Sequence, residues 1–396
     1  MSIAQKAREI QSEIVQWRRD LHQIPEVGLE VPQTSAYVAR ELEKLGVEHK
    51  TGVGGYGVVG IIRGDYPGKT IGLRADMDGL AIQEETGLPF ASTIAGKMHA
   101  CGHDSHTAMQ LGAAKLLLEN KDKLTGNAKL IFQPAEEGPG GAKPMIDDGV
   151  MENPKVDAVL GLHIGLVFKE VGTGQVGVGY GQLMACLDRF KIIIKGKGCH
   201  GAMPEMGVDP IVIAGQVIST LQTIVSREIA PTTPAVVTIG IIRGGQAYNI
   251  IPDIVEMEGT ARALDQQVRE KNAARIEDIV KQVTRGMRGD YEFEYIFGYP
   301  ALSNDAEFTK EFVKVAQEIV GEENVLEIAK PTMGGEDFAF FLKMVPGTFF
   351  FLGGGNEEKG IVYPHHSAKF DVDEDVFWKG TALLTQGAID WLTRNC

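Results

Sequence analysis

Apolar side chains recur at helical spacing along residues 1–45. One face of the first predicted helix carries Ile10, Ile14, Trp17 and Leu21. This helix should start at Ile3 and end near Pro25, because proline cannot continue a helix. A second helix is predicted over residues 34–45, since the glycine that follows it, Gly46, is typical of a helix end.

Beyond Gly46 the pattern changes to short apolar runs that predict buried strands. The runs are VVGIIRG from residue 58, KTIGLRAD from residue 69, NAKLIFQ from residue 127 and VDAVLGLHI from residue 156. A helix is expected between the second and third run, over residues 105–118, with Asp104 or Ser105 as its N-cap. Strands that alternate with helices indicate an α/β domain with an at least partly parallel sheet.

Residues 187–297 show a different order of elements. In chain order they predict the strand DRFKIIIKG, a helix over 209–227, the strands AVVTIGIIRGG and DIVEMEGTARAL, a helix over 265–287 and the strand DYEFEYIF. This βαββαβ order is typical of a ferredoxin-like domain. Because 396 residues are enough for two domains, we predict a discontinuous α/β domain, residues 1–186 and 298–396, with the ferredoxin-like domain 187–297 inserted into it.

Composition and charge exclude several classes of protein. Hydrophobic residues make up 43% of the chain and charged residues 23%, which excludes a disordered protein. The net charge of -14 is spread without a long run of one sign, so we expect neither nucleic acid nor an anionic membrane as a partner. No stretch resembles a membrane span, and the start of the chain lacks the apolar core of a signal peptide, so a cytoplasmic location is expected.

The cysteines and one glycine-rich segment bear on possible disulfides and cofactors. The four cysteines are too few and too scattered for a disulfide framework, so each is either a buried small side chain or a candidate for metal or redox chemistry. The glycines of TGVGGYG, residues 51–57, have the spacing of a dinucleotide-binding motif, but a strand-like run follows them instead of a helix. We therefore predict a turn between strands and no nicotinamide or flavin cofactor.

Residues with metal-binding side chains follow the predicted strands. In MHACGHD, Cys101 and His103 are two positions apart, and extended side chains at that spacing share a face and can reach one cation. In FQPAEEG, Glu136 and Glu137 follow an apolar run, where the strand ends of an open α/β sheet form the ligand crevice. One of two neighbouring carboxylates can bind a cation while the other moves a proton.

Histidines add to these donors. His163 ends the run VDAVLGLHI, and His365 and His366 stand on a polar loop. Taken singly, these motifs have ordinary explanations: an incidental Cys-x-His, a solvated carboxylate pair and a core histidine. Taken together, they form a sulfur, nitrogen and oxygen donor set that suits zinc, manganese, cobalt or nickel, and that consists of Cys101, His103, Glu137, His163 and a C-terminal histidine.

Longer motifs occur in collinear order from about residue 17 to residue 370. They are LRADMDGLAIQEETG, MHACGHD, FQPAEEGPGGA, GLHIG, GKGCHGAMP, NIIPD, GGEDFAFF and HHSAKFD. With these motifs the chain resembles the M20 metallopeptidase superfamily in its amidohydrolase branch. That branch includes N-acyl-amino-acid amidohydrolases, hippurate hydrolases, some carboxypeptidases and the plant auxin-conjugate hydrolases.

The resemblance implies an aminopeptidase-like catalytic domain that holds two divalent metal ions per subunit, zinc, manganese, cobalt or nickel. It implies Glu136 as the general base, and as ligands Cys101 in a bridging position, His103, Glu137, His163 and His366. Other M20 branches place a His-x-Asp ligand motif where this chain has Arg74-Ala75-Asp76. Asp76 is therefore implied as a residue behind the ligands, because Arg74 cannot bind a cation.

The inserted domain is implied to be a lid that also forms the dimer, so a homodimer is expected, with a homotetramer as the alternative. His200 is implied to reach the active site of the other subunit and to stabilise the oxyanion. Asn249 and Arg262 resemble lid residues that contact substrate, although a strand-end cap and a surface ion pair would explain them equally well. This chain departs from its relatives at Cys199 and Glu205, where glycine and histidine are common, and at Ala368, where proline is common.

The function implied by the resemblance is metal-dependent hydrolysis of the amide bond of a small-molecule N-acyl amino acid, which gives a carboxylic acid and a free amino acid. A metallo-carboxypeptidase or dipeptidase with the same metal centre is the alternative. A non-catalytic binding protein would require the loss of Glu136 or of ligands, and all of them are present. The motifs leave the acyl group and the identity of the metal open.

Overall fold

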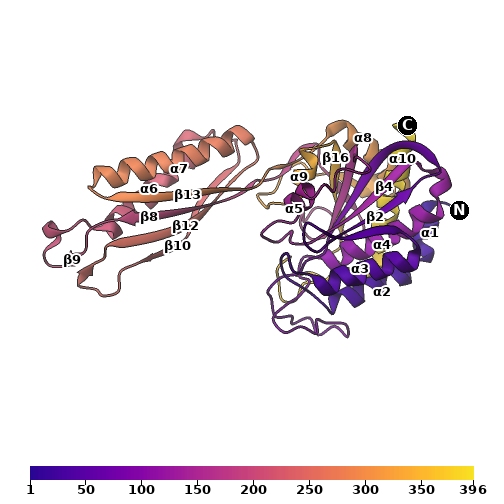
Figure 1. Cartoon of the computed structure of the whole chain (residues 1–396), viewed down its shortest axis with the longest axis horizontal. Coiled ribbons are helices and arrows are strands. Elements are labelled where there is room, and N and C mark those ends of the chain that lie inside the picture. The colour runs from indigo at the N-terminus through magenta and orange to yellow at the C-terminus, as the bar shows by residue number, and fades with distance from the viewer. The chain divides into compact units, whose positions relative to one another are not determined.

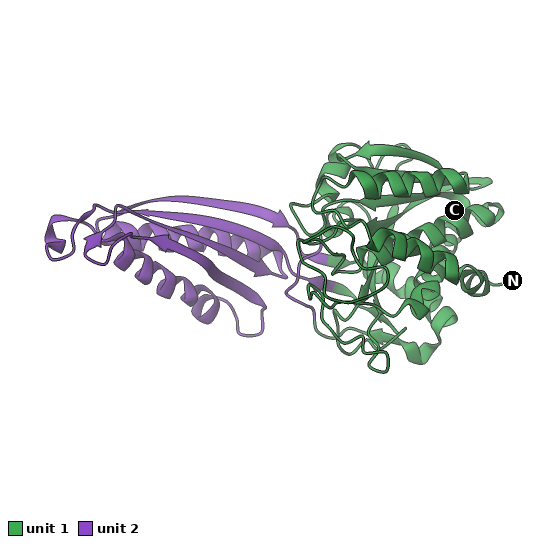
Figure 2. Ribbon diagram, turned by 90° about the horizontal axis from the view of Figure 1, so that it is seen from below, with its two compact units in different colours: residues 1–181, 303–330, 337–396 green, residues 182–302, 331–336 purple.

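A computed structural model describes all residues from Met1 to Cys396. The chain forms two compact units, which Figure 2 shows in different colours. Unit 1 comprises residues 1–181, 303–330 and 337–396, and unit 2 comprises residues 182–302 and 331–336. Each unit encloses its own hydrophobic core. The predicted insertion, residues 187–297, lies within unit 2.

Unit 1 is built on an eight-stranded mixed sheet (Figure 1). In sheet order the strands are β1 (Glu48–Val53), β2 (Gly57–Arg63), β4 (Thr125–Gln133), β3 (Tyr66–Asp76), β5 (Ala158–Gly165), β16 (Gly347–Gly353), β6 (Val176–Val178) and β15 (Val325–Glu327). Strand β3 pairs parallel with β4 and β5, whereas β1, β2 and β4 pair antiparallel. The prediction of an α/β domain with an at least partly parallel sheet is confirmed, and the glycine-rich segment is the turn between β1 and β2 as expected.

The helices of unit 1 are α1 (Ile3–Glu9), α2 (Gln11–His22), α3 (Pro32–Leu45), α4 (His103–Glu119), α5 (Ala142–Asp147), α8 (Ala306–Val320), α9 (Ala339–Leu342) and α10 (Phe377–Arg394). The single helix predicted at the start of the chain was wrong, because α1 ends and α2 begins around Ile10. The backbone of Ile10 leaves the helical region only slightly, so the apolar stripe continues across the break and hides it. Helix α3 begins at Pro32, earlier than predicted, since proline suits the first position of a helix.

Helix α4 also begins earlier than predicted. Its N-cap is Gly102, not Asp104 or Ser105, and His103 is its first residue. Gly102 has a φ of +87°, and a Cβ atom there would lie 3.0 Å from Cγ2 of Ile164, so only glycine fits without strain. Cys101 and His103 therefore lie on either side of a left-handed turn, and not along an extended segment as the sequence suggested.

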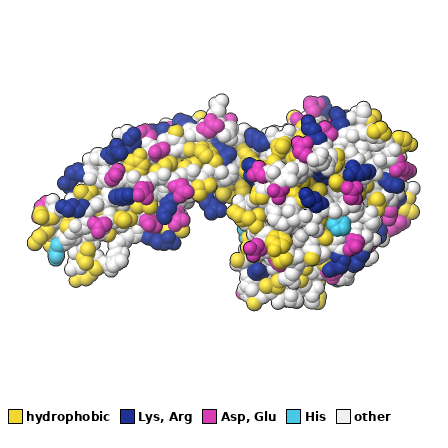
Figure 3. Space-filling view, viewed as in Figure 1, with side chains coloured by type: hydrophobic (Ala, Val, Ile, Leu, Met, Phe, Trp, Pro, Cys, Tyr) yellow, Lys and Arg dark blue, Asp and Glu magenta, His cyan; other side chains and the backbone are white.

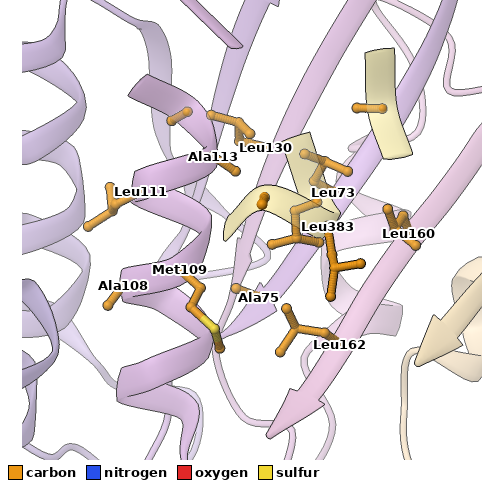
Figure 4. Close-up of a cluster of buried hydrophobic side chains, with 14 of the residues drawn as sticks. Leu73, Ala75, Ala108, Met109, Leu111, Ala113, Leu130, Leu160, Leu162 and Leu383 are labelled. Atoms are coloured by element: carbon orange, nitrogen blue, oxygen red, sulfur yellow. The ribbon is translucent and has the colours of Figure 1, made fainter. Parts of the chain in front are cut away.

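Helix α4 packs against α2, α10 and strand β3. The close-up in Figure 4 shows the contact between this layer and the sheet, where Met109 of α4 and Leu383 of α10 lie among Leu73, Leu160 and Leu162 from the strands. These side chains are fully or almost fully buried. The core thus fixes the start of α4 near the carboxyl ends of β3, β4 and β5, the edge at which open α/β sheets bind ligands.

Unit 2 contains β8 (Leu187–Lys195), α6 (Pro210–Thr223), β10 (Ala235–Gly244), β12 (Ile254–Ala263), α7 (Gln266–Gly286) and β13 (Asp290–Tyr299). The sheet order β10-β12-β8-β13, with antiparallel pairing throughout, is that of the predicted ferredoxin-like fold. Alternate residues of β8, namely Phe190, Ile192 and Ile194, belong to the core beneath the helices. Helix α6 ends in a π-helical turn over 224–228, so the regular helix is shorter than predicted.

Short strands complete the two units. In unit 2, β9 (Cys199–His200) pairs with β11 (Ile250–Ile251) at the end of the sheet where β8 ends and β12 starts. Strands β7 (Gly181–Met184) and β14 (Leu302–Asn304) lie where the chain passes between the units. None of the helices has the length and apolar character that crossing a membrane requires.

Candidate metal centre

The carboxyl ends of three neighbouring strands carry the acidic residues and one histidine of the site. Asp76 is the last residue of β3 and Asp78 follows it, while Glu136 and Glu137 stand in the turn after β4. His163 lies near the end of β5. Because β3 is parallel to both neighbours, these ends meet at one edge of the sheet.

Two segments outside these strands add the remaining donors. The turn before α4 places the sulfur of Cys101 3.4 Å from Nε2 of His163. His103, at the start of α4, has its Nε2 atom 4.0 Å from Oε2 of Glu136. His366, on the loop before α10, has its Nε2 atom 3.1 Å from Oε1 of Glu137. The structure thus brings all five predicted ligands and Glu136 together in unit 1.

The loop of His366 is held by the segment that carries Cys101. The backbone N–H of His366 donates to the carbonyl of Ala100 at 2.8 Å. His366 has a φ of +64°, and Ala135, which precedes the glutamate pair, has a φ of +59°. Such left-handed conformations are uncommon outside glycine and cluster at functional sites. Of these two strained residues, His366 is itself a predicted ligand and Ala135 directly precedes Glu136.

Distances among the donor atoms define five groups that could each hold a cation, and two of these groups consist entirely of predicted ligands. One group is Cys101, His103 and His163, and the other is Cys101, Glu137 and His366. In each group the donor atoms lie within 4.8 Å of one another. Both groups contain Cys101, so its sulfur is placed where a bridging ligand would be.

The hydrogen bonds of the imidazoles fit a metal centre. Nδ1 of His163 is 2.9 Å from the carbonyl of Ile164, which can only accept, so the proton is on Nδ1 and the lone pair of Nε2 faces Cys101. Nδ1 of His103 is likewise 3.2 Å from Oδ1 of Asp78. The Nε2 atom of His103 is buried without a hydrogen-bond partner. A buried nitrogen in this state is what a cation would satisfy.

The charges of the site also favour a cation. Burial and the carboxylates of Glu137 and Glu136 raise the pKa of the Cys101 thiol well above its usual value. Burial opposes protonation of His103, but Asp76 and Asp78 outweigh it and raise the pKa of His103 to about 10. Without a metal ion the centre therefore retains protons, and a cation would displace them.

Asp78 is a site residue that the sequence reasoning missed. Its two carboxylate oxygens accept the backbone N–H groups of Glu136 at 3.0 Å and Glu137 at 3.1 Å, and one of them accepts from His103. Asp78 thus fixes the glutamate turn and orients a histidine at once. The signal in the sequence that could have revealed Asp78 is its position just after β3, two residues beyond Asp76.

Asp76 contacts two histidines and an arginine of the site. Its Oδ1 atom is 2.6 Å from Nδ1 of His106, and its Oδ2 atom accepts from Arg74 at 2.5 Å. Oδ2 of Asp76 is 3.7 Å from Nε2 of His103. His106 is a second missed residue, although it stands only two residues beyond the motif MHACGHD.

A buried ion cluster holds the start of α4 from the other side. Asp104, next to His103, accepts from Nε of Arg18 at 2.9 Å and contacts Nδ1 of His22 at 2.7 Å. Burial alone would raise the pKa of Asp104, but Arg18 and His22 lower it well below its usual value. Arg18 also donates to Asp371 and Glu374, so the cluster joins α2, α4 and the loop after His366.

The charge of His22 should make the stability of unit 1 depend on pH. Burial and Arg18 lower the pKa of His22, but its contacts with Asp104 and Glu84 outweigh them, so the pKa is raised above its usual value of about 6.5. The stabilisation is then fully present below pH about 6.5 and is lost as pH rises through the folded-state pKa. The wild type should exceed His22→Gln by about 1–3 kcal/mol in free energy of unfolding at pH 6, and the difference should shrink at higher pH.

Urea denaturation of both proteins across the pH range measures this difference. The Glu84→Gln variant is the matched test of the mechanism, because the Glu84 carboxylate is 3.3 Å from Nε2 of His22. When both proteins also carry Glu84→Gln, the pH-dependent part of the difference between their free energies of unfolding should be smaller. A difference that is constant or grows with pH would contradict the assigned charge.

The lid residues named from the sequence lie in unit 2, and the structure does not bring all of them together. His200 of β9 is exposed, and Asn249 is close to it, because the carbonyl of Asn249 accepts the N–H of Gly201 at 2.8 Å. Arg262 stands near the end of β12, eight residues from its start at Ile254. His200 and Arg262 are thus at opposite ends of the unit 2 sheet, about 26 Å or more apart at the usual rise per residue.

Comparisons with known proteins identify the family of the chain. Residues 72–389 match the peptidase family M20/M25/M40. Thermostable carboxypeptidase 1 of Saccharolobus solfataricus is 47% identical and the match covers 94% of each chain. N-acetyl-L-cysteine deacetylase of Bacillus subtilis is 41% identical, over 98% of this chain and 90% of that protein. The crystal structure of the Bacillus subtilis YXEP protein, a dinuclear metal-binding peptidase of the M20 family, has a TM-score of 0.82 at 34% identity and covers 98% of this chain and 99% of its own.

Proposed function

The chain belongs to the peptidase family M20/M25/M40 and is a metal-dependent hydrolase, and from this premise we propose that it hydrolyses the amide bond of N-acyl amino acids. The products are a carboxylic acid and a free amino acid. The observation that carries the proposal is the convergence of the two donor groups on Cys101, with the carboxylate of Glu136 4.0 Å from His103. Relatives named as an N-acetyl-L-cysteine deacetylase and as plant IAA-amino acid hydrolases support this substrate class.

We assign the residues as follows. Divalent ions held by Cys101, His103, Glu137, His163 and His366 would polarise the amide carbonyl and make water more acidic. Glu136, which is 7% exposed and held through its N–H by Asp78, takes a proton from the attacking water and returns it to the leaving nitrogen. Asp78 keeps Glu136 and Glu137 in fixed positions, so that one carboxylate is free to move protons while the other binds.

The test is release of free amine by protein that was stripped with a chelator and reloaded separately with zinc, manganese, cobalt or nickel. The substrates are N-acetyl, N-benzoyl and longer N-acyl amino acids, with simple dipeptides beside them. Metal-dependent release of amine that is faster from the N-acyl amino acids than from the dipeptides supports the proposal. The preferred substrate in the series also narrows the range of possible acyl groups. No release from any substrate by protein with bound metal would contradict it.

A carboxypeptidase or dipeptidase is the second candidate function. It is favoured by one specific observation, the 47% identity to thermostable carboxypeptidase 1, which exceeds the 41% identity to the deacetylase. The same metal centre and Glu136 would serve both reactions, because an amide bond is cleaved in each. Preference for dipeptides or for peptides with a free carboxyl terminus in the same assay would favour this candidate.

We further propose that unit 2 forms a homodimer through β10. This strand is at the edge of the sheet, so one row of its backbone groups has no strand partner. Its residues Ile241 and Ile242 are exposed, as are Ile250 and the fully exposed Tyr248 nearby. Figure 3 shows hydrophobic side chains on the surface at the end of unit 2 that carries β9. An exposed apolar edge is suited to pairing with a second copy of the chain.

The positions of His200 and Arg262 support a site shared between subunits. One rigid sheet separates them by about 26 Å, so a single small substrate cannot touch both residues of the same chain. If both contact substrate, as the family resemblance implies, a second copy must supply one of them. The dimer would then be required for catalysis and not only for stability.

Mixing two inactive variants tests the shared site. His200→Ala and Glu136→Gln should each be inactive as homodimers, whereas mixed dimers contain one active site with both residues intact. We expect about a quarter of the wild-type rate when subunits exchange statistically, because half of the dimers are mixed and each has one complete site. Absence of rescue in mixed dimers verified by mass spectrometry would contradict action of His200 in the other subunit.

A further inference from the structure

His106 is a buried histidine that lies between two of the proposed ligands and has no part in the mechanism above. Its ring centroid is 5.4 Å from that of His103 and 4.7 Å from that of His163. By distance alone, Asp76, His103 and His106 could hold a cation. The hydrogen bonds of His106 indicate a different use of this side chain.

Both ring nitrogens of His106 already have partners. Nε2 is 2.9 Å from the backbone N–H of Ile164, which can only donate, so Nε2 carries the lone pair. The proton is therefore on Nδ1, which donates to Oδ1 of Asp76 at 2.6 Å. With one nitrogen accepting and the other donating, His106 has no lone pair left for a metal ion.

Asp76 is in turn fixed by the fully buried Arg74. The guanidinium of Arg74 donates to Oδ2 of Asp76 at 2.5 Å, to Oδ1 of Asp337 at 2.7 Å and to Oε1 of Gln133 at 2.9 Å. Asp337 also accepts the N–H groups at the start of α5. The carboxylate that holds His106 therefore cannot rotate without breaking a charged, buried network.

The other end of this chain of hydrogen bonds reaches a proposed ligand. Strand β3 pairs with β5 only as far as Arg74 and Gly161, so on that side Ile164 lies beyond the ladder and its N–H donates to His106, while β16 pairs with Ile164 on the other side. The carbonyl of the same residue accepts from Nδ1 of His163. Fixing Ile164 thus fixes the group that orients the His163 ring.

We propose that His106 is a positioning residue that sets the orientation of His163 through Ile164, with Arg74 and Asp76 as its anchor. The inference rests on the proposed function, because His163 matters only as a ligand of the proposed metal centre. Contacts of this kind behind a ligand typically contribute about 10- to 100-fold to metal affinity. The arrangement preorganises the lone pair of His163 before a cation arrives.

The test is cobalt binding to chelator-stripped protein, measured by calorimetry and by the visible absorption spectrum of the bound ion. His106→Phe removes both hydrogen bonds, and His106→Asn keeps a polar group that is too short to span Asp76 and the N–H of Ile164. Both should bind cobalt about 10- to 100-fold more weakly and with an altered spectrum. His106→Gln should recover most of the affinity, since its amide can donate to Asp76 and accept from Ile164.

His99→Phe is the matched control, because His99 is equally buried on the same segment and its ring nitrogens have no hydrogen-bond partner. It should bind cobalt like the wild type. If His106→Phe does not fold, as judged by its melting temperature without metal, His106→Asn decides the question. Wild-type affinity and spectrum in His106→Asn, or a glutamine variant as weak as the asparagine variant, would overturn the inference. A wild type that binds no cobalt would instead overturn the proposed metal centre.

Discussion

Replacement of Glu136 by glutamine is expected to leave the metal in place and to reduce turnover by about 100- to 10,000-fold. Glutamine keeps the size of the side chain but cannot take a proton from water. The backbone N–H of residue 136 would still donate to Asp78, so the turn should keep its shape. The measurement is the kcat for amine release at saturating substrate, together with the metal content by mass spectrometry.

Glu137→Gln is the matched control, since the two residues are neighbours in one turn and both are held by Asp78. The carboxylate of Glu137 contacts His366 and shares a donor group with Cys101 and His366, so this variant should lose metal affinity as well as rate. Excess metal should therefore rescue Glu137→Gln in part and Glu136→Gln not at all. A near-normal rate in Glu136→Gln would show that another group moves the proton.

Much of the fold could be predicted because its signals are local. The buried strands of unit 1 are apolar runs bounded by polar turns, and β8 of unit 2 alternates between buried positions and positions that are partly or fully exposed. The family resemblance rests on whole motifs and is confirmed by the match over residues 72–389. Periodicity could not show the break at Ile10, because the apolar stripe passes through it.

The start of α4 was misjudged because a long-range contact determines it. Asp104 and Ser105 are good N-caps by composition, but Gly102 takes the position, since the space beside it is filled by Ile164. That neighbour is far away in the sequence and belongs to β5. The same turn decides how Cys101 and His103 face the site.

In the candidate site, sequence reasoning finds donors more readily than the residues that orient them. Cys101, His163 and His366 stand out by residue type at the ends of predicted elements. Asp78, His106 and Arg18 act through hydrogen bonds to partners that the sequence does not reveal. The bond from Arg74 to Asp337 joins residues 263 positions apart, so no local pattern could indicate it.

The lid shows a further limit of motif reasoning. His200 and Arg262 were both associated with substrate, and nothing in the motifs says how far apart they lie in one chain. The register of β12 against β8 places them at opposite ends of one sheet. Because of this distance, a site shared between two subunits is required if both residues contact substrate.

Cys101→Ala should remove at least one of two bound ions and most of the activity. Its sulfur is the only donor common to both groups, so its loss affects both cations at once, whereas removal of His163 or His366 affects one group. Alanine fits the site sterically, because Cys101 is buried and a smaller side chain causes no clash. The expected result is a stoichiometry at or below one ion per chain after dialysis against a fixed free metal concentration.

Cys186→Ala separates this effect from the general loss of a buried thiol. Cys186 is also buried, but it lies in unit 2, where its sulfur accepts the N–H of Ala263 at 3.1 Å. That variant should keep both ions and the thiolate-to-cobalt absorption band, whereas Cys101→Ala should lack the band. An unchanged stoichiometry and an unchanged band in Cys101→Ala would show that the sulfur is not a ligand. The carboxylates and histidines of the site would then have to hold the cations without the sulfur. The negative charge of the carboxylates, and not the thiolate, would be the main source of metal affinity.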